Sequence, residues 1–464
     1  MNKLRLVSQQ FSNLRSFSTS RVRQASLGAC GMKPDYGPLE IGRCTLMNGI
    51  QLVSARPFGA QMAACTILYQ SGSRFERDDQ LGATHFLRTC SSTAGCSYTT
   101  FSKTRVLQQL GSYITVNSDR QSVAFTLRCP VPAFHDVKYY LLDIAARTCF
   151  RQFEIDAYKP QLKRDLQNIH PEVLVMDLIQ KACWGGGLNN SVFCEKERID
   201  SMSSTDLDAF SVLNMRSDTC TVGSYGLPHD EVMAFSEMIE YKRELPVSPR
   251  CYPPSFARGG FEYHDLGPNS DTWIAVAVPG CGNTDIPCLM THNIIASACG
   301  TGNNSRGQHD EDRVPQPPLG GYATDVFTKY RAFNISYADS GVFGILVKTR
   351  SCNACSAALI ASSFLKKLGQ LTPYQICIGK QRLKLDIALQ EEDCVSISEG
   401  MALQAACSAR LDNAYEAIKL LNTVTDQEVF ATAKCLASKC NRMAVAVVGD
   451  VQAVPHDREL LCAC

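Results

Sequence analysis

The sequence has no apolar run of about 18 residues, the length that a helix needs to cross a bilayer. Its longest apolar runs are strand-length, as in Trp273-Ile-Ala-Val-Ala-Val-Pro279. We therefore expect no transmembrane span. The chain also has little net charge, +1 over 464 residues, which gives no reason to expect a nucleic acid or an acidic partner.

Cysteine spacings typical of redox cofactors are absent as well. The chain has 23 cysteines but no C-x-x-C-H and no ferredoxin-type or Rieske-type spacing. Most cysteines interrupt apolar stretches, as in Ala64-Cys65-Thr66-Ile67, which predicts small buried thiols in a reducing compartment. The lone C-x-x-C at Cys352 and Cys355 is interpreted as two buried thiols on one helix face rather than a metal site.

Acidic residues are missing before Asp35, whereas lysine, arginine and serine are frequent there. This composition is typical of a mitochondrial transit peptide. Arg15 stands third before a plausible cleavage between Phe17 and Ser18. We predict a transit peptide and flexible N-terminus at residues 1–34; a disordered basic terminus is the alternative.

Residues 81–90, Leu-Gly-Ala-Thr-His-Phe-Leu-Arg-Thr-Cys, predict the front of a helix with a degenerate zinc motif. In the inverted motif H-x-x-E-H, two histidines four apart bind zinc and the glutamate activates water. His85 is present, but Arg88 stands at the glutamate position and Thr89 at the second histidine. The third, acidic ligand of such enzymes lies about 76 residues further on, where this chain has Asp165.

Arg88 opposes zinc binding at this position. Arginine stays protonated and accepts no hydrogen bond. Its charge at about 5 Å from Zn²⁺, with an effective dielectric of about 20, repels the ion by roughly 6–7 kcal/mol. Threonine is a poor zinc ligand. We therefore predict no catalytic, metal-binding or cofactor-binding residue, and an enzymatically inactive chain.

Three hypotheses for these side chains stay open. His85 is interpreted as a helix histidine hydrogen-bonded inside an inherited cleft. Arg88 could pair with Asp165 across the former metal position, because a charge-assisted hydrogen bond would replace the metal–carboxylate attraction. An active peptidase would instead need two further ligands beside His85 and Asp165 while tolerating Arg88.

A strand–turn–strand–helix order occurs twice. Residues 113–129 form two strands around a polar turn before a helix at 131–148, and residues 331–348 do the same before a helix at 354–368. This predicts an internal repeat of about 210 residues. Asn48-Gly49 predicts a further hairpin. Hairpin-joined strands interleaved with helices favour an α+β fold with mostly antiparallel sheets.

We predict an N-terminal domain at 35–243 with the degenerate zinc motif, a proline-rich linker at 244–256 and a C-terminal domain at 257–464. With these segments the chain resembles the pitrilysin-like family of zinc peptidases, in particular its mitochondrial branch. That branch holds the processing-peptidase subunits and the core proteins of the cytochrome bc1 complex. The resemblance rests on residues 82–92, 161–163 and 333–345. It implies two homologous α/β domains, each a mostly antiparallel sheet packed with helices.

The resemblance also implies a function. It points to a non-catalytic structural core subunit of mitochondrial ubiquinol–cytochrome c reductase, complex III, peripheral to the matrix side of the inner membrane. Implied partners are core protein 1 and other subunits including cytochrome b, with no nucleic acid. The resemblance further implies that the chain carries no haem, iron–sulfur cluster or other cofactor, and the cysteine spacings agree with this.

The alternative is the non-catalytic, presequence-binding subunit of the mitochondrial processing peptidase. In such a subunit the glycine-rich residues 299–307 would be a peptide-binding loop; otherwise they are a plain flexible loop. Residues 309–313 are interpreted as a solvated acidic turn.

Overall fold

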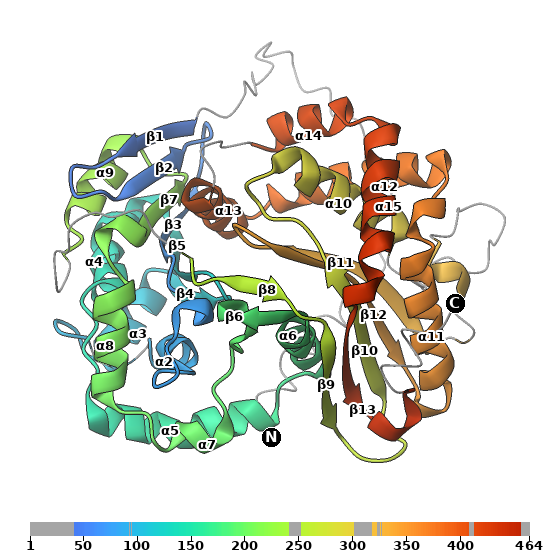
Figure 1. The fold of residues 1–464 in the computed structure, drawn as a ribbon. Helices are drawn as coiled ribbons and strands as arrows, with labels where there is room; N and C mark the ends of the chain where they lie inside the picture. Colours follow the sequence, from blue (N-terminus) through green and yellow to red (C-terminus); the bar gives the residue numbers. More distant parts are fainter. Residues whose placement is uncertain are drawn as a thin grey trace, which may run out of the picture. The chain divides into compact units, whose positions relative to one another are not determined.

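Two β-sheets organise the chain, shown as a computed structural model in Figure 1. The structure describes residues 41–91, 93, 95–240, 252–300, 318–322, 325, 327–407 and 413–455. The predicted transit peptide, most of the glycine-rich stretch, the acidic turn at 309–313 and linker residues 244–251 lie outside these ranges. None of the helices in these ranges is both long and apolar enough to span a membrane.

The first sheet has six strands in the order β1-β2-β7-β3-β5-β4. They are β1 (Ile41–Thr45), β2 (Gln51–Ala55), β3 (Met62–Tyr69), β4 (Tyr113–Ser118), β5 (Val123–Pro130) and β7 (Cys220–Tyr225). All neighbours are antiparallel except β2 and β7. The hairpin predicted at Asn48-Gly49 is confirmed, because β1 pairs with β2 and Gly49 has the φ of 87° that favours glycine.

The second sheet has five strands in the order β11-β12-β10-β13-β9. They are β9 (Gly260–Asp265), β10 (Thr272–Pro279), β11 (Lys329–Ser336), β12 (Gly341–Thr349) and β13 (Ala444–Gly449). Only β13 and β9 are parallel. This order repeats β4-β5-β3-β7-β2 strand for strand, so the predicted internal repeat is confirmed. A small third sheet pairs β6 (Trp184–Gly186) with β8 (Ser255–Ala257).

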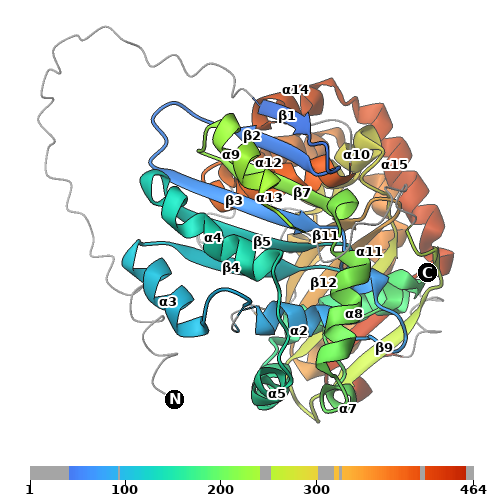
Figure 2. The ribbon, with the colours of Figure 1, turned by 90° about the vertical axis from the view of Figure 1, so that its left-hand side faces the viewer.

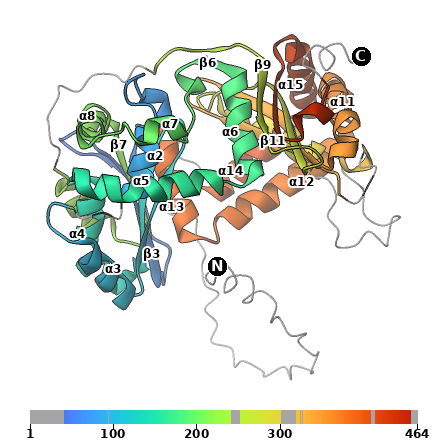
Figure 3. The same ribbon diagram turned by 90° about the horizontal axis from the view of Figure 1, so that it is seen from below.

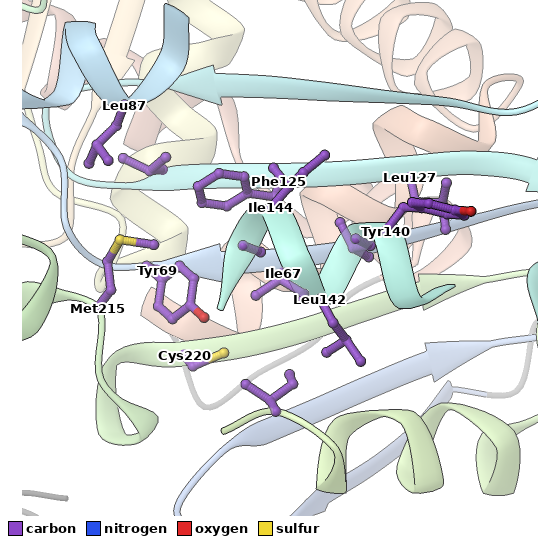
Figure 4. Packing of buried hydrophobic residues seen from close by; sticks show 14 of the residues in the cluster. Ile67, Tyr69, Leu87, Phe125, Leu127, Tyr140, Leu142, Ile144, Met215 and Cys220 are labelled. Carbon is purple, nitrogen blue, oxygen red and sulfur yellow. The ribbon is translucent and has the colours of Figure 1, made fainter. Parts of the chain in front are cut away.

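The first half contributes the helices α2 (Ala83–Cys90), α3 (Thr100–Gln109), α4 (Phe134–Ala145), α5 (Gln152–Gln167), α7 (Lys196–Ile199), α8 (Ser204–Asn214) and α9 (His229–Glu237). Helices α2, α4 and α9 contact the strands of the six-stranded sheet, and the others pack on these helices or on one another. In the core shown in Figure 4, Ile67 and Phe125 from the strands share a cluster with Leu142 and Ile144 from α4. Because successive strand residues face opposite sides, Leu68 and Ala124 belong to the other face.

The second half has its own core around α11. Its helices are α10 (Ile286–Cys299), α11 (Ala354–Lys366), α12 (Pro373–Gln390), α14 (Ala414–Thr423) and α15 (Asp426–Ser438). Buried Ala357, Ala358 and Ala361 of α11 pack in one cluster with Ile345 of β12. The helices predicted at 131–148 and 354–368 are therefore present as α4 and α11.

Two helices are exchanged between the halves (Figure 3). Helix α6 (Pro171–Cys183) packs on the five-stranded sheet, where Val175 and Ile179 share a cluster with Ala275. Helix α13 (Cys394–Cys407) packs on the six-stranded sheet, opposite α4 (Figure 2). The exchange joins residues 41–240 to residues 252–455 through apolar contacts that the sequence analysis did not predict.

Polar contacts of the two equivalent hairpin turns, 119–122 and 337–340, add to this join. Gln121 Oε1 accepts a hydrogen bond from Ala338 N at 2.9 Å. The buried Arg74 side chain donates to both carboxylate oxygens of Asp339, at 2.7 and 2.6 Å. The turns of the two repeats thus contact each other. The domain boundaries at 243/244 and 256/257 stay a prediction.

Candidate functional site

Helix α2 is held at its N-terminus by a buried carboxylate. Glu76 accepts hydrogen bonds from Gly82 N at 2.8 Å, Thr84 N at 2.8 Å and Thr84 Oγ1 at 2.6 Å. The first backbone N–H groups of a helix lack partners within the helix, so the carboxylate satisfies two of them. Gly82, with a φ of 95°, precedes the helix as its N-cap. These contacts fix the backbone that carries His85 and Arg88.

The Glu76 carboxyl is predicted to make stability depend on pH. Burial raises its pKa from 4.5 to about 7, although hydrogen bonds from Thr84 and Gly82 act in the opposite direction. A raised folded-state pKa means that the folded chain binds more protons than the unfolded chain between these values. The stabilisation is therefore complete below about pH 4.5 and is lost as the pH rises through about 7.

Glu76→Gln removes this titration. The free energy of unfolding of the wild type, relative to Glu76→Gln, is expected to fall by about 2–3 kcal/mol between about pH 5 and about pH 8. Urea unfolding at several pH values measures this difference. A difference that stays constant or grows with pH would contradict the raised pKa.

His85 lies buried and is engaged through one ring nitrogen. Its Nδ1 accepts a hydrogen bond from Cys194 N at 3.2 Å, so the neutral ring carries its proton on Nε2. Its ring meets Phe193 edge to face, with centroids 5.7 Å apart. Burial, with a smaller effect of the Arg88 charge, lowers its pKa to about 3. The prediction of a hydrogen-bonded helix histidine is confirmed.

Arg88 binds a hydroxyl and an aromatic ring instead of a carboxylate. Its Nη1 donates to Ser118 Oγ at 2.9 Å, and its guanidinium carbon lies 5.5 Å from the Phe193 ring centroid. Asp165 is exposed on α5, and no ion pair joins it to Arg88. The predicted Arg88–Asp165 pair is therefore wrong, because α5 presents Asp165 to solvent.

The described residues around α2 bring no set of metal ligands together. Throughout the described ranges, only Cys281, Cys288 and His292 form a group of three or more such residues close enough to share an ion, and they belong to the second half. Glu76 and Cys194 were not singled out from the sequence. Cys194 contacts His85 across 109 residues of chain, and no local pattern marks such a pair. That His85, Arg88, Thr89 and Asp165 have no catalytic or metal-binding role stays a prediction.

The interpretation of the C-x-x-C as two buried thiols is wrong. Cys352 and Cys355 are both exposed. Cys352 lies in a short 3₁₀ helix before α11, and Cys355 lies on the outer side of α11, whose inner side is formed by small residues such as Ala354 and Ala358. Other cysteines do behave as buried hydrophobes; burial raises the pKa of Cys299, for example, to about 12.

Restoring the missing motif residues is expected not to restore peptidase activity. Arg88→Glu with Thr89→His rebuilds H-x-x-E-H around His85, but the third ligand position, Asp165, stays exposed. His85 Nδ1 also stays occupied by Cys194 N. Cleavage of a presequence peptide by this double variant should match the wild-type background. Cleavage by the double variant that a metal chelator abolishes would contradict the conclusion that this region cannot assemble a zinc site.

Comparisons with known proteins agree with this architecture. Residues 52–196 match the family Insulinase (Peptidase family M16). The chain is 24% identical over 461 residues to human cytochrome b-c1 complex subunit 2, covering 97% of this chain and 98% of the relative. It is 23% identical over 438 residues to mitochondrial-processing peptidase subunit alpha from Solanum tuberosum, covering 91% and 84%.

A solved structure gives the same result for the fold. A chain of complex III2 from Candida albicans, with Inz-5 bound, matches with a TM-score of 0.77 at 13% identity, covering 91% of this chain and 99% of that one. The predicted α+β architecture and the predicted resemblance are both confirmed. The chain has the pitrilysin-like fold of the M16 peptidases and is similar over nearly its whole length to subunit 2 of the cytochrome b-c1 complex.

Proposed function

We propose that this chain is a non-catalytic structural core subunit of mitochondrial ubiquinol–cytochrome c reductase, complex III. The observation that carries the proposal is the similarity to cytochrome b-c1 complex subunit 2 over 97% of this chain and 98% of the relative. In this role the chain supports assembly and stability of the complex and transfers no electrons itself. Its partners are core protein 1 and other subunits including cytochrome b. It lies peripherally on the matrix side of the inner membrane.

The surroundings of α2 support the non-catalytic part of the proposal. A zinc peptidase needs three protein ligands and a general base around an open position. Here a permanent cation, Arg88, stands at the position of the base, and the hydroxyl of Ser118 and the ring of Phe193 bind it. The one histidine, His85, accepts a backbone hydrogen bond. These contacts give His85 and Arg88 a packing role.

The second candidate is the presequence-binding subunit of the mitochondrial processing peptidase. The 23% identity to the alpha subunit from Solanum tuberosum favours it. The two functions differ in what is lost with the chain. A complex III subunit is needed for the amount of assembled, haem-containing complex, whereas a processing subunit is needed for precursor cleavage.

Depletion and rescue test the proposal. Removing the chain should lower the amount of assembled complex III, measured by haem b absorbance after native separation. Rescue with the wild type or with His85→Gln should restore it equally, since the imidazole has no catalytic role in this proposal. Accumulation of uncleaved precursors at an unchanged amount of complex III would support the processing-peptidase function instead.

A further inference from the structure

A cysteine–histidine cluster lies at the start of α10, in the second half of the chain. Cys281 belongs to the loop between β10 and α10, and Cys288 and His292 are four residues apart on α10. Each offers one potential ligand atom, and these three atoms lie within 4.8 Å of one another. Residues four apart on a helix share a face, which accounts for the pairing of Cys288 with His292.

The backbone that carries the cluster is fixed on both sides. Asp285 Oδ1 accepts a hydrogen bond from Cys288 N at 3.1 Å and caps α10. The loop before α10 is held to the β11–β12 turn by the bonds Gly280 N to Gly341 O at 2.6 Å and Asn283 N to Tyr337 O at 2.7 Å. A Cβ at Gly341 would lie 2.1 Å from the Cys281 carbonyl oxygen, so the two segments are in close backbone contact. The backbone at Cys281 is therefore held in place.

The distances suit a thiophilic metal ion. With Zn–S near 2.3 Å and Zn–N near 2.1 Å, tetrahedral sulfur and nitrogen ligands lie about 3.6 Å apart. Cys288 Sγ and His292 Nδ1 are 3.7 Å apart. His292 is buried, with 3% of its surface exposed. In the neutral ring Nδ1 donates to the Cys288 carbonyl oxygen at 2.7 Å, and Nε2 is buried without a hydrogen-bond partner. Binding of an ion through Nδ1 therefore requires that this hydrogen bond breaks and that the ring carries its proton on Nε2.

We propose that Cys281, Cys288 and His292 bind one Zn²⁺ ion through two thiolates and one imidazole nitrogen. Two thiolates balance the charge of the ion, and a water or a fourth side chain completes the coordination. Both thiols lose their protons to solvent on binding, so affinity is expected to fall at low pH.

The role inferred for this site is structural. The loop of Cys281 packs on residues 336–341, and Asp339 in that turn binds Arg74 of the first half. An ion that fixes the loop would also stabilise the turn at the join between the halves. This inference does not depend on the proposed function, because it concerns only metal binding by the isolated chain.

Zinc binding to the full chain tests the proposal. The chain is purified in the reduced state and stripped of metal. Zn²⁺ is then added without oxygen in the presence of a chromophoric chelator that competes for the ion. In a separate titration, the charge-transfer absorbance of Co²⁺ reports thiolate ligands. The wild type should take up one tight equivalent and melt at a higher temperature with zinc. Cys288→Ser and His292→Gln should lose both effects. The matched control is Cys352→Ser with Cys355→Ser, an exposed cysteine pair elsewhere, and it should keep both.

Folding and adventitious binding are controlled separately. Far-UV circular dichroism and the metal-free melting temperature show whether Cys288→Ser still folds, so that lost binding is not mistaken for lost structure. If Cys288→Ser misfolds, His292→Gln carries the test. The proposal is overturned if the folded variants bind zinc as the wild type does. It is equally overturned if only the control loses the metal, or if Cys281 and Cys288 are found joined as a disulfide in the chain as isolated.

Discussion

Arg120→Ala is expected to lower the free energy of unfolding by about 3–5 kcal/mol. Arg120 and Asp177 form a buried ion pair at 2.7 Å, with side chains only 2% and 5% exposed. Arg120 also donates to the backbone oxygen of Leu188 at 3.1 Å. The variant would leave the Asp177 carboxylate buried with only Ser191 Oγ and Val192 N as donors. A buried charge without an ionic partner is more costly than the loss of the pair itself.

Equilibrium unfolding in urea measures this effect, with a surface ion pair as the control. Lys163 and Asp200 lie equally close, at 2.7 Å, but are 35% and 68% exposed, so Lys163→Ala should cost at most about 1 kcal/mol. Arg120→Met combined with Asp177→Leu should recover much of the loss, because it removes both charges. Equal costs for Arg120→Ala and Lys163→Ala would show that the buried pair is not formed.

Ala402→Asp is expected to destabilise the chain by about 3–5 kcal/mol through the exchanged helix α13. Ala402 is fully buried in a cluster with Leu68 and Ala124 on the six-stranded sheet. The approach there is close, since a Cβ at Gly223 would lie 2.9 Å from the Ala402 Cβ. An aspartate at this position would bury a charge among apolar side chains, or force α13 away from the sheet.

Gln404→Asp is the matched control, because Gln404 is exposed on the same helix and receives the same residue. It should change the free energy of unfolding by less than about 1 kcal/mol. Hydrogen exchange identifies the element affected: in Ala402→Asp, the amides of α13 and of β7 should lose protection before those of β10 and β12. Equal effects of the two substitutions would mean that α13 does not pack on this sheet.

Local patterns predicted the individual elements of this fold. Asn48-Gly49 marked a hairpin because few residues other than glycine adopt the required φ. The repeated strand–turn–strand–helix order predicted both α4 and α11 with their sheets. The exchange of α6 and α13 was not predictable in this way. Each helix belongs to one half of the sequence but packs on the sheet of the other half, and an apolar helix face does not identify the sheet that it covers.

The candidate site was predicted only where the determinants are local. The loss of the zinc motif at Arg88 and Thr89 can be read directly from the sequence. A hydrogen-bonded His85 was also predicted, although its partner, Cys194 N, was not. The pairing of Arg88 with Asp165 was wrong, because motif spacing gives sequence position but not the orientation of α5. The cluster of Cys281, Cys288 and His292 was missed, since its loop is positioned by the distant β11–β12 turn.

The proposed role is tested most directly by the stoichiometry of this chain relative to cytochrome b. Inner membranes are solubilised in mild detergent and separated under native conditions, and both polypeptides are quantified in the band that absorbs as haem b. We expect this chain in that band at a ratio of one to one with cytochrome b. Migration apart from haem b, together with a zinc-containing partner, would contradict the core-subunit function and favour the processing peptidase.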